Sequence, residues 1–290
     1  MSAGSPIVRL GAVSYLNTRP LVEGLEARPD VALRFDVPAR CADLVEAGEV
    51  ELGLVPIIEY ARHADDYAVV PDVSIASRAA VDSVALFTRQ PIERVRSIAL
   101  DVSSRTSAGL TRLLCARHFG IRPTFVPAAP DIRAMLATAD AALLIGDPAL
   151  FLDPASVDAE KIDLGLAWRA MTGLPFVWAF WAGRPDAIDA AGIEALQHAR
   201  DRGVADSEAI ALQFAAEVSP KSAQRTKADE LCARYLRDNI KYRLGDRETR
   251  GLRRYYELAA KHGVVRESRP PQFYPQPVAS GFSRKSGASA

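Results

Sequence analysis

A strand, a polar turn and a helix follow one another directly within the first 25 residues. The segment Ile7–Val13 is apolar and β-prone, and a short helical pattern begins at Arg19-Pro20, with the proline in the first turn, where its missing N–H costs nothing. Open α/β sheets present their ligand groups at such junctions, where strands end and helices begin. The turn carries four hydrogen-bonding side chains, which belong to Ser14, Tyr15, Asn17 and Thr18.

Asn17 is the most versatile of these side chains, because its amide offers donor and acceptor atoms without a charge. It is therefore suited to a hydroxyl group or a carboxylate of a ligand, as is Ser14 to a hydroxyl. Ser, Asn and Thr also cap helices. The turn alone therefore leaves helix capping and ligand binding as alternatives.

The same alternation of apolar strands and amphipathic helices continues along the chain, which predicts an α/β fold with parallel sheets covered by helices. A chain of 290 residues is long enough for two lobes. We expect the chain to cross between lobes at Gln90-Pro91 and to return at the aromatic strand Phe176–Ala182. Further strands are expected at Leu52–Val55, Val84–Phe87, Ser97–Leu100 and Ala141–Ile145.

Two lobes and a tail follow from this pattern. Residues 1–90 with 183–268 are expected to form the first lobe, and residues 91–182 the second. Residues 269–290 are rich in Pro, Ser and Gly, which is typical of a flexible tail. Helical patterns occupy 186–200, 207–217, 224–243 and 246–262. The apolar stripe of the last pattern predicts core packing, and it consists of Leu252, Tyr255, Tyr256 and Ala259.

Composition excludes several classes of partner. Lys plus Arg and Asp plus Glu both number 36, whereas a nucleic-acid or anionic-membrane surface needs a basic excess. We expect no membrane partner, because no run of about 18 apolar residues occurs and no secretory signal is recognisable. The cysteines Cys41, Cys115 and Cys232 lie far apart in apolar patterns, which indicates core packing in a reducing compartment. A cytoplasmic protein is therefore expected.

A second polar turn, residues 101–107, separates a buried strand from an amphipathic helix. Hydroxyl groups and backbone N–H groups at a helix start form an anion site, which the positive end of the helix dipole assists. We predict that Thr106 and Ser107 bind a substrate carboxylate, with Ser104 as a weaker candidate. Plain capping of the helix is the alternative.

Asp147 follows a third buried strand in the sequence Gly146-Asp147-Pro148. Its carboxylate is suited to a hydroxyl group, or to acid or base chemistry if its pKa is raised; it is equally suited to capping the next turn. The four histidines form no catalytic spacing and no metal cluster. The glycines form neither a P-loop nor a dinucleotide fingerprint, so neither a metal nor a cofactor is expected.

Five blocks of the sequence resemble, in order, the chorismate dehydratase family of the futalosine route to menaquinone, and they span roughly residues 7–262. Five ordered blocks are far more specific than any one of them. The blocks are Ser14-Tyr15-Leu16-Asn17-Thr18-Arg19-Pro20, Leu54-Val55-Pro56-Ile57-Ile58-Glu59-Tyr60-Ala61-Arg62, Ser83-Val84-Ala85-Leu86-Phe87, Arg105-Thr106-Ser107 and Leu144-Ile145-Gly146-Asp147-Pro148-Ala149-Leu150.

The resemblance implies a type II periplasmic-binding-protein-like fold, in which a ligand cleft lies between two α/β lobes. It implies dehydration of chorismate to 3-[(1-carboxyvinyl)oxy]benzoate, with Asn17 and Asp147 as catalytic candidates. Ser83 is carried over as a substrate contact, and Glu59 and Arg40 are second-tier candidates. Ala39 stands where many relatives carry Ser, which puts a contact there in doubt. The resemblance fits a mechanism in which the enolpyruvyl carboxylate of the substrate takes the proton.

Several alternatives stay open at this stage. Asp147 is the alternative base to the carboxylate of the substrate. A binding protein for a small carboxylate would share the fold without catalysing a reaction. A lyase that releases pyruvate from chorismate would share the substrate. The likeness to the sister enzyme that makes dihydroxynaphthoate is at the level of the fold only.

Overall fold

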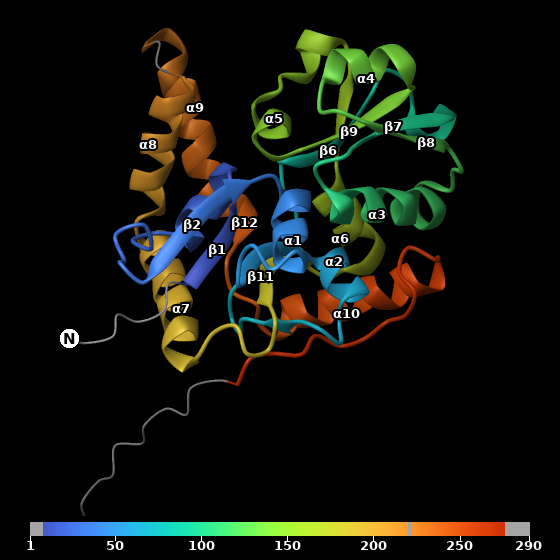
Figure 1. Ribbon diagram of the computed structural model, residues 1–290. Helices are drawn as coiled ribbons and strands as arrows, with labels where there is room; N and C mark the ends of the chain where they lie inside the picture. Colours follow the sequence, from blue (N-terminus) through green and yellow to red (C-terminus); the bar gives the residue numbers. More distant parts are fainter. Residues whose placement is uncertain (1–7, 220–221, 276–290) are drawn as a thin grey trace, which may run out of the picture.

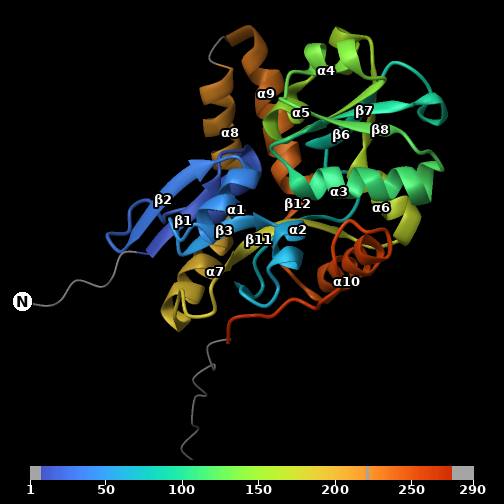
Figure 2. The ribbon, with the colours of Figure 1, turned by 45° about the vertical axis from the view of Figure 1, so that its right-hand side comes forward.

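The computed structural model describes residues 8–219 and 222–275, which form two α/β lobes that are each built on one sheet (Figure 1). The first lobe is the seven-stranded sheet with α1, α2, α7 and α10. The second lobe is the five-stranded sheet with α3, α4 and α5. Two lobes of this kind are what the sequence predicts. Figure 2 shows that α3 lies along the boundary between them, next to α2.

The sheet of the first lobe has the strand order β12-β5-β11-β3-β1-β2, and β4 pairs with β11. Strand β1 runs parallel to β2 and β3, whereas β11 runs antiparallel to β3, β4 and β5. The strands are β1 (Val8–Val13), β2 (Val31–Asp36), β3 (Leu52–Pro56), β4 (Ala68–Val69), β5 (Ile75–Ser77), β11 (Phe176–Gly183) and β12 (Ile240–Lys241).

The sheet of the second lobe has the order β10-β6-β9-β7-β8. Strand β7 runs parallel to β8 and β9, and β6 runs antiparallel to β9 and β10. Both sheets are therefore mixed, and the expectation of parallel sheets was wrong for β6 and β11. The strands are β6 (Val84–Thr88), β7 (Ser97–Asp101), β8 (Thr124–Ala128), β9 (Ala141–Ile145) and β10 (Glu160–Asp163).

The chain changes sheets earlier than the sequence predicts. Strand β6 already belongs to the second sheet, so the first crossing precedes Val84 instead of following at Gln90-Pro91. Strand β11 belongs to the first sheet, so the return precedes Phe176. Both strands consist of buried residues, and a continuous apolar strand does not indicate which sheet it joins. The expected lobe boundaries at residues 90 and 182 therefore do not coincide with the points at which the chain passes from one sheet to the other.

Helices cover both sheets and fill the space beside them. None of the helices within residues 8–219 and 222–275 has both the length and the apolar composition to cross a membrane. The α-helices are α1 (Pro38–Glu46), α2 (Ile57–Arg62), α3 (Arg105–Leu114), α4 (Ile132–Thr138), α5 (Gly146–Phe151), α6 (Leu164–Thr172), α7 (Ala190–Ala205), α8 (Ser207–Val218), α9 (Ser222–Arg234) and α10 (Asp246–Lys261). Shorter turns are the 3₁₀ helices Leu16–Leu21, Ile92–Arg94 and Pro154–Val157, and the π turns Cys115–Phe119 and Tyr235–Asn239.

The C-terminal helices follow the sequence prediction with one exception. The pattern at 224–243 is not one helix, because α9 passes into the π turn Tyr235–Asn239 and the chain then adds β12 to the first sheet. The predicted stripe of α10 packs in the core, since Leu252, Tyr255 and Tyr256 are fully buried. The edge of the Tyr255 ring packs against Trp168.

The first part of the predicted tail is packed against the first lobe. The backbone N–H of Tyr274 donates to the carbonyl of Val69, and Val69 donates to the carbonyl of Gln272. The Tyr274 side chain is buried, and its hydroxyl donates to the carbonyl of Arg184. A flexible tail beginning at Arg269 was therefore wrong for residues 269–275, and residues 276–290 lie outside the described part of the chain.

Candidate active site

The loop after β1 is held at the boundary between the lobes. Tyr15 is extended, and the 3₁₀ helix begins at the next residue. The backbone N–H of Leu16 donates to the Asp147 carboxylate, at 3.1 Å and 3.3 Å from the two oxygens. A carboxylate at a helix start satisfies an N–H group that has no partner inside the helix. This bond joins the loop of Asn17 to α5 in the second lobe.

Helix α3 begins at the opposite side of the boundary with three hydroxyl groups. The Ser104 Oγ accepts from the Ser107 backbone N–H at 3.3 Å, and the Ser104 hydroxyl donates to the Ser107 Oγ at 2.8 Å. The Thr106 Oγ1 accepts from the Ile58 backbone N–H at 3.3 Å. Because the Ser107 and Thr106 oxygens accept these bonds, their own protons stay available to a ligand. Two such donors at a helix start suit an anion.

Asn17 and Thr106 line the same cavity, which holds about 500 Å³ of empty space including its opening to solvent. Ser83 and Ser107 lie in the same lining. The structure thus brings together four of the six residues that the sequence puts forward for substrate binding.

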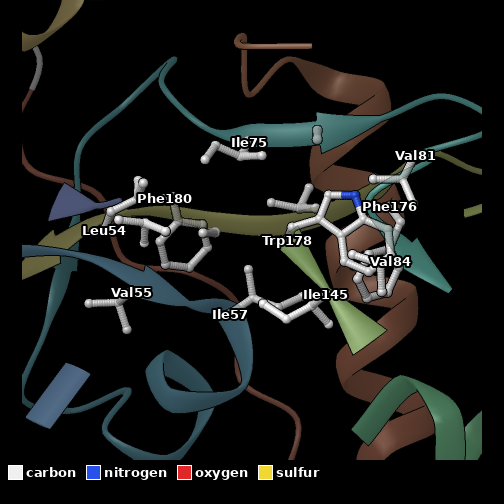
Figure 3. Packing of buried hydrophobic residues seen from close by; sticks show 14 of the residues in the cluster. Leu54, Val55, Ile57, Ile75, Val81, Val84, Ile145, Phe176, Trp178 and Phe180 are labelled. Carbon is white, nitrogen blue, oxygen red and sulfur yellow. The ribbon is translucent and has the colours of Figure 1, made fainter. Parts of the chain in front are cut away.

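The rest of the lining is largely apolar. The indole of Trp178 is held by a 3.1 Å hydrogen bond from its Nε1 to the Ser77 Oγ. An apolar wall facing a set of hydroxyl and amide groups fits an unsaturated carbon ring with polar substituents. Figure 3 shows the side chains of this wall, which include Ile75, Val81, Val84, Ile145 and Trp178.

The groups of the cavity lining that suit an anion are neutral hydroxyl and amide groups. Across residues 8–219 and 222–275, the lining contains no lysine, arginine or histidine. Fixed dipoles in a site that excludes water stabilise developing negative charge effectively. The hydroxyl groups at the start of α3 and the amide of Asn17 therefore carry this task.

Tyr235 connects Asn17 to Ser83 behind the lining. The Asn17 Nδ2 donates to the Tyr235 hydroxyl at 3.1 Å, and the Tyr235 and Ser83 hydroxyl oxygens lie 2.7 Å apart. Tyr235 is fully buried, and burial raises the pKa of its hydroxyl well above its usual value. The phenol therefore keeps its proton at neutral pH.

Tyr15 is the one aromatic side chain that the polar loop contributes to the lining. Burial raises the pKa of Tyr15 to about 12, so its hydroxyl keeps its proton. The ring packs on Gly146, where an added Cβ would meet ring atoms at 2.5 Å. Gly146 also has a φ of +67°, a conformation that side-chain-bearing residues rarely adopt. Glycine is therefore needed at this position for two reasons.

Two of the predicted site residues lie outside the lining. Ser14 is exposed, and its backbone N–H continues the pairing of β1 with β2 by donating to Asp36 at 3.0 Å. Ser14 therefore does not line the cavity, whereas the next residue, Tyr15, does. Asp147 uses both carboxylate oxygens on the Leu16 N–H.

The second-tier candidates also lie outside the lining. The buried carboxylate of Glu59 pairs with Arg62 at 2.6 Å and with Arg105 at 3.1 Å. Arg40 pairs with Glu49 on the surface. Both side chains therefore form salt bridges, and neither lines the cavity.

The lobes are joined at the edge of the cavity by Arg105. This side chain reaches from α3 to Asp43 of α1 at 2.7 Å and to Glu59 of α2 at 3.1 Å. The carbonyl of Ser103 in the second lobe also accepts from the Ala39 N–H at 3.0 Å. These contacts hold the lobes together next to Thr106.

Replacing Arg105 by Ala is expected to raise KM about tenfold with a smaller effect on kcat, because the bonds it removes hold the closed arrangement and do not touch the ligand. One ion-paired arginine that is about a third exposed contributes roughly 1 kcal/mol. Steady-state kinetics measure this. Arg34→Ala removes the 2.7 Å surface pair with Glu49 within the first lobe and serves as the control. An equal KM for the Arg105→Ala variant and the wild type would contradict this role.

Three contributors to the site have weak signals in the sequence. Tyr15 belongs to the polar turn, but a turn does not reveal which side chain points inward. Trp178 lies in a continuous aromatic strand that reads as core. Tyr235 lies within a helical pattern, 218 residues from its partner Asn17, and local periodicity carries no information about such a contact.

Metal-ligand types and thiols are the remaining reactive groups of the described residues. No group of three or more His, Cys, Asp or Glu side chains in 8–219 and 222–275 is placed to hold a metal ion. The three cysteines are buried and free, and burial raises the pKa of Cys41 to about 12. Their predicted role in core packing is confirmed.

Known proteins resemble this chain in sequence and in structure. A chorismate dehydratase of Thermus thermophilus is 29% identical over 287 residues, which are 92% of this chain and 98% of that protein. A crystal structure of a protein from Archaeoglobus fulgidus superposes with a TM-score of 0.69 at 17% identity, covering 91% of this chain and 100% of that one.

The periplasmic aliphatic sulphonate binding protein of Escherichia coli superposes with a TM-score of 0.62 at 15% identity, covering 98% of this chain and 99% of that one. At this identity the likeness concerns the fold alone, and it confirms the predicted periplasmic-binding-protein-like architecture. In sequence, the family described as menaquinone biosynthesis matches residues 8–261. This chain, whose two lobes enclose one polar and apolar cavity, therefore belongs to the menaquinone biosynthesis family.

Proposed function

We propose that this protein is a chorismate dehydratase, which converts chorismate to 3-[(1-carboxyvinyl)oxy]benzoate and water on the futalosine route to menaquinone. The observation that carries the proposal is the lining of the cavity, which combines Asn17, Ser83, Thr106 and Ser107 with largely apolar neighbours. The similar protein of Thermus thermophilus carries the name of this activity. A cytoplasmic location and a small-molecule substrate as the partner accompany the proposal.

The proposed reaction removes a ring proton and the neighbouring hydroxyl group, and it leaves a benzene ring. Aromatisation supplies most of the driving force, and conjugation with the ring carboxylate acidifies the C–H bond. The protein has to fix two carboxylates, stabilise the developing negative charge and assist the departure of hydroxide. The free hydroxyl protons of Thr106 and Ser107 suit a carboxylate, and Asn17 and Ser83 suit the leaving hydroxyl group.

The base is the remaining part of the mechanism. Within the described part of the chain, no lysine, arginine or histidine lies in the lining, and Asp147 lies outside it with its carboxylate accepting from the Leu16 N–H. We therefore assign proton removal to the enolpyruvyl carboxylate of the substrate, and to Asp147 the task of holding the loop that carries Asn17. Rotation of the lobes toward each other would exclude water around the bound ring.

Incubation of the purified protein with chorismate tests the function. Ultraviolet spectra and chromatography are expected to show the enolpyruvyl benzoate and no free pyruvate. Accumulation of pyruvate would identify a chorismate lyase instead. Binding of chorismate without any product would identify a carboxylate-binding protein on the same fold. Either of these outcomes would overturn the proposal.

Replacing Asp147 by Asn is expected to leave kcat within about threefold of the wild type, because an amide oxygen still accepts from Leu16.

The same replacement should also change how the stability of the protein depends on pH. Burial raises the pKa of Asp147 to about 6, so the folded protein holds this proton more tightly than the unfolded chain. Protonated Asp147 therefore stabilises the folded wild-type protein below about pH 4, and this contribution to the free energy of unfolding is lost as the pH rises through 6.

Thermal unfolding between pH 4 and 7 measures this effect, since the Asn variant lacks the titration and should gain stability relative to the wild type by roughly 2 kcal/mol across that range. A folded Asp147→Asn protein that lost turnover a hundredfold or more would make Asp147 the base.

A further inference from the structure

The hydroxyl group of Tyr235 lies between the side chains of Asn17 and Ser83, two residues of the cavity lining that come from outside α3. Its oxygen is 3.1 Å from the Asn17 Nδ2 and 2.7 Å from the Ser83 Oγ. Tyr235 itself does not line the cavity, whereas Asn17 and Ser83 do. Any effect of Tyr235 on a ligand therefore has to pass through these two residues.

Counting protons fixes the direction of this small network. The amide nitrogen of Asn17 can only donate, so the Tyr235 oxygen accepts from it. If Ser83 also donated to Tyr235, the phenol proton would be left buried, because the residues of 8–219 and 222–275 supply no third partner to that hydroxyl. A buried donor without a partner costs about 1–3 kcal/mol. Tyr235 therefore donates to Ser83, and the buried phenol proton has a partner.

This direction has a consequence inside the cavity. The Ser83 Oγ accepts from Tyr235, so its own proton is free and its free side faces the lining. The Asn17 Nδ2 gives one of its two N–H groups to Tyr235, so its second N–H group and its amide oxygen, which has only a long 3.5 Å contact from Thr18, remain for the cavity. The cavity thus presents a hydroxyl donor from Ser83 beside the amide of Asn17.

We propose that Tyr235 is a positioning residue that makes Ser83 a hydrogen-bond donor to a substrate oxygen. The proposal rests on the proposed dehydration, in which a departing hydroxide needs a donor. The backbone agrees with a functional role, because Tyr235 begins a π turn after α9, and such turns are frequent at functional sites. The turn interrupts the helix where the phenol reaches Ser83.

Tyr242 supplies a matched control within the same part of the chain. It is buried like Tyr235, but its hydroxyl has no hydrogen-bond partner among the described residues. Tyr235→Phe and Tyr242→Phe therefore remove the same atom from similar surroundings, and only the first change breaks the bonds to Asn17 and Ser83. The two variants separate positioning from the general effect of losing a buried hydroxyl group.

Turnover of chorismate by these variants tests the proposal. Tyr235→Phe is expected to lower kcat about 10- to 100-fold with KM within about threefold, since the oriented bond matters most as charge develops. Tyr242→Phe should keep the wild-type kcat. Combining Tyr235→Phe with Ser83→Ala should cost no more than Ser83→Ala alone, because the two residues act in series.

The opposite results overturn the proposal. One such result is a kcat of the Tyr235→Phe variant within threefold of the wild type. The other is a double variant whose loss of kcat equals the product of the losses caused by Tyr235→Phe and by Ser83→Ala. If Tyr235→Phe does not fold, Ser83→Ala decides, since full turnover without the Ser83 hydroxyl overturns a role that acts through it. Absence of product from the wild-type protein overturns the dehydration itself, and is thereby distinguished from a failure that concerns Tyr235 alone.

Discussion

Replacing Asn17 by Asp is expected to reduce kcat/KM roughly a thousandfold. The change puts a negative charge into a lining that has no cationic side chain within the described residues, opposite a substrate with two carboxylates. It also replaces the donor that faces Tyr235 by a group that can only accept. An uncompensated charge in a partly buried position costs about 3–5 kcal/mol, which is roughly two to four powers of ten in rate.

The pH dependence of this variant provides the check. Protonation of the new carboxyl group removes the charge, so the variant should regain part of its activity as the pH falls, while the wild type should not. Steady-state kinetics between pH 4.5 and 8 measure this. Ser14→Ala is the matched control, because Ser14 lies in the same turn and is exposed; its kcat/KM should stay within twofold. Full activity of Asn17→Asp at neutral pH would refute a contact between Asn17 and an anionic ligand.

The second large effect is expected from replacing Gly146 by Ala. The added Cβ would lie 2.5 Å from the ring of Tyr15, which lines the cavity. The ring has to move toward the space for the ligand, so we expect kcat/KM to fall about a hundredfold. The φ of +67° adds a strain of about 1 kcal/mol for any side chain.

Gly173 separates the clash from the strain. It also has a positive φ, of +72°, but an added Cβ there meets nothing within 4 Å. Gly173→Ala should lose about 1 kcal/mol of stability, measured by chemical unfolding, and keep its turnover. Gly146→Ala should lose more stability and lose turnover as well. Equal kinetics for the two variants would show that the position of Tyr15 is irrelevant to the reaction.

The sequence is most informative where a feature is local and periodic. The stripe of α10 follows the helical period, and Tyr255 and Tyr256 are buried as it predicts. The start of α3 is equally local, because Ser104, Thr106 and Ser107 lie within one turn. Ser104 also caps the helix by accepting from the Ser107 N–H, but all three hydroxyl groups lie in the cavity lining, so this part of the lining could be predicted.

Features that depend on distant partners could not be predicted in this way. Strand β6 reads as a buried strand, but its partners β9 and β10 come later in the chain, and apolar residues do not identify them. The turn after β1 illustrates the same limit on a smaller scale. The turn places Tyr15 rather than Ser14 in the cavity lining. This choice depends on the 3₁₀ helix and on the bond from the Leu16 N–H to Asp147, which is 131 residues away in the sequence.

The two sheets differ in how soon they can form during synthesis on the ribosome. All strands of the five-stranded sheet lie between Val84 and Asp163, so this lobe can close as soon as that continuous stretch has emerged. The seven-stranded sheet needs β11 and β12, the last of which ends at Lys241. Because domains fold as their segments become available, the second lobe should form on the nascent chain before the sheet of the first lobe is complete. The network of Asn17, Ser83 and Tyr235 is completed only when Tyr235 has emerged.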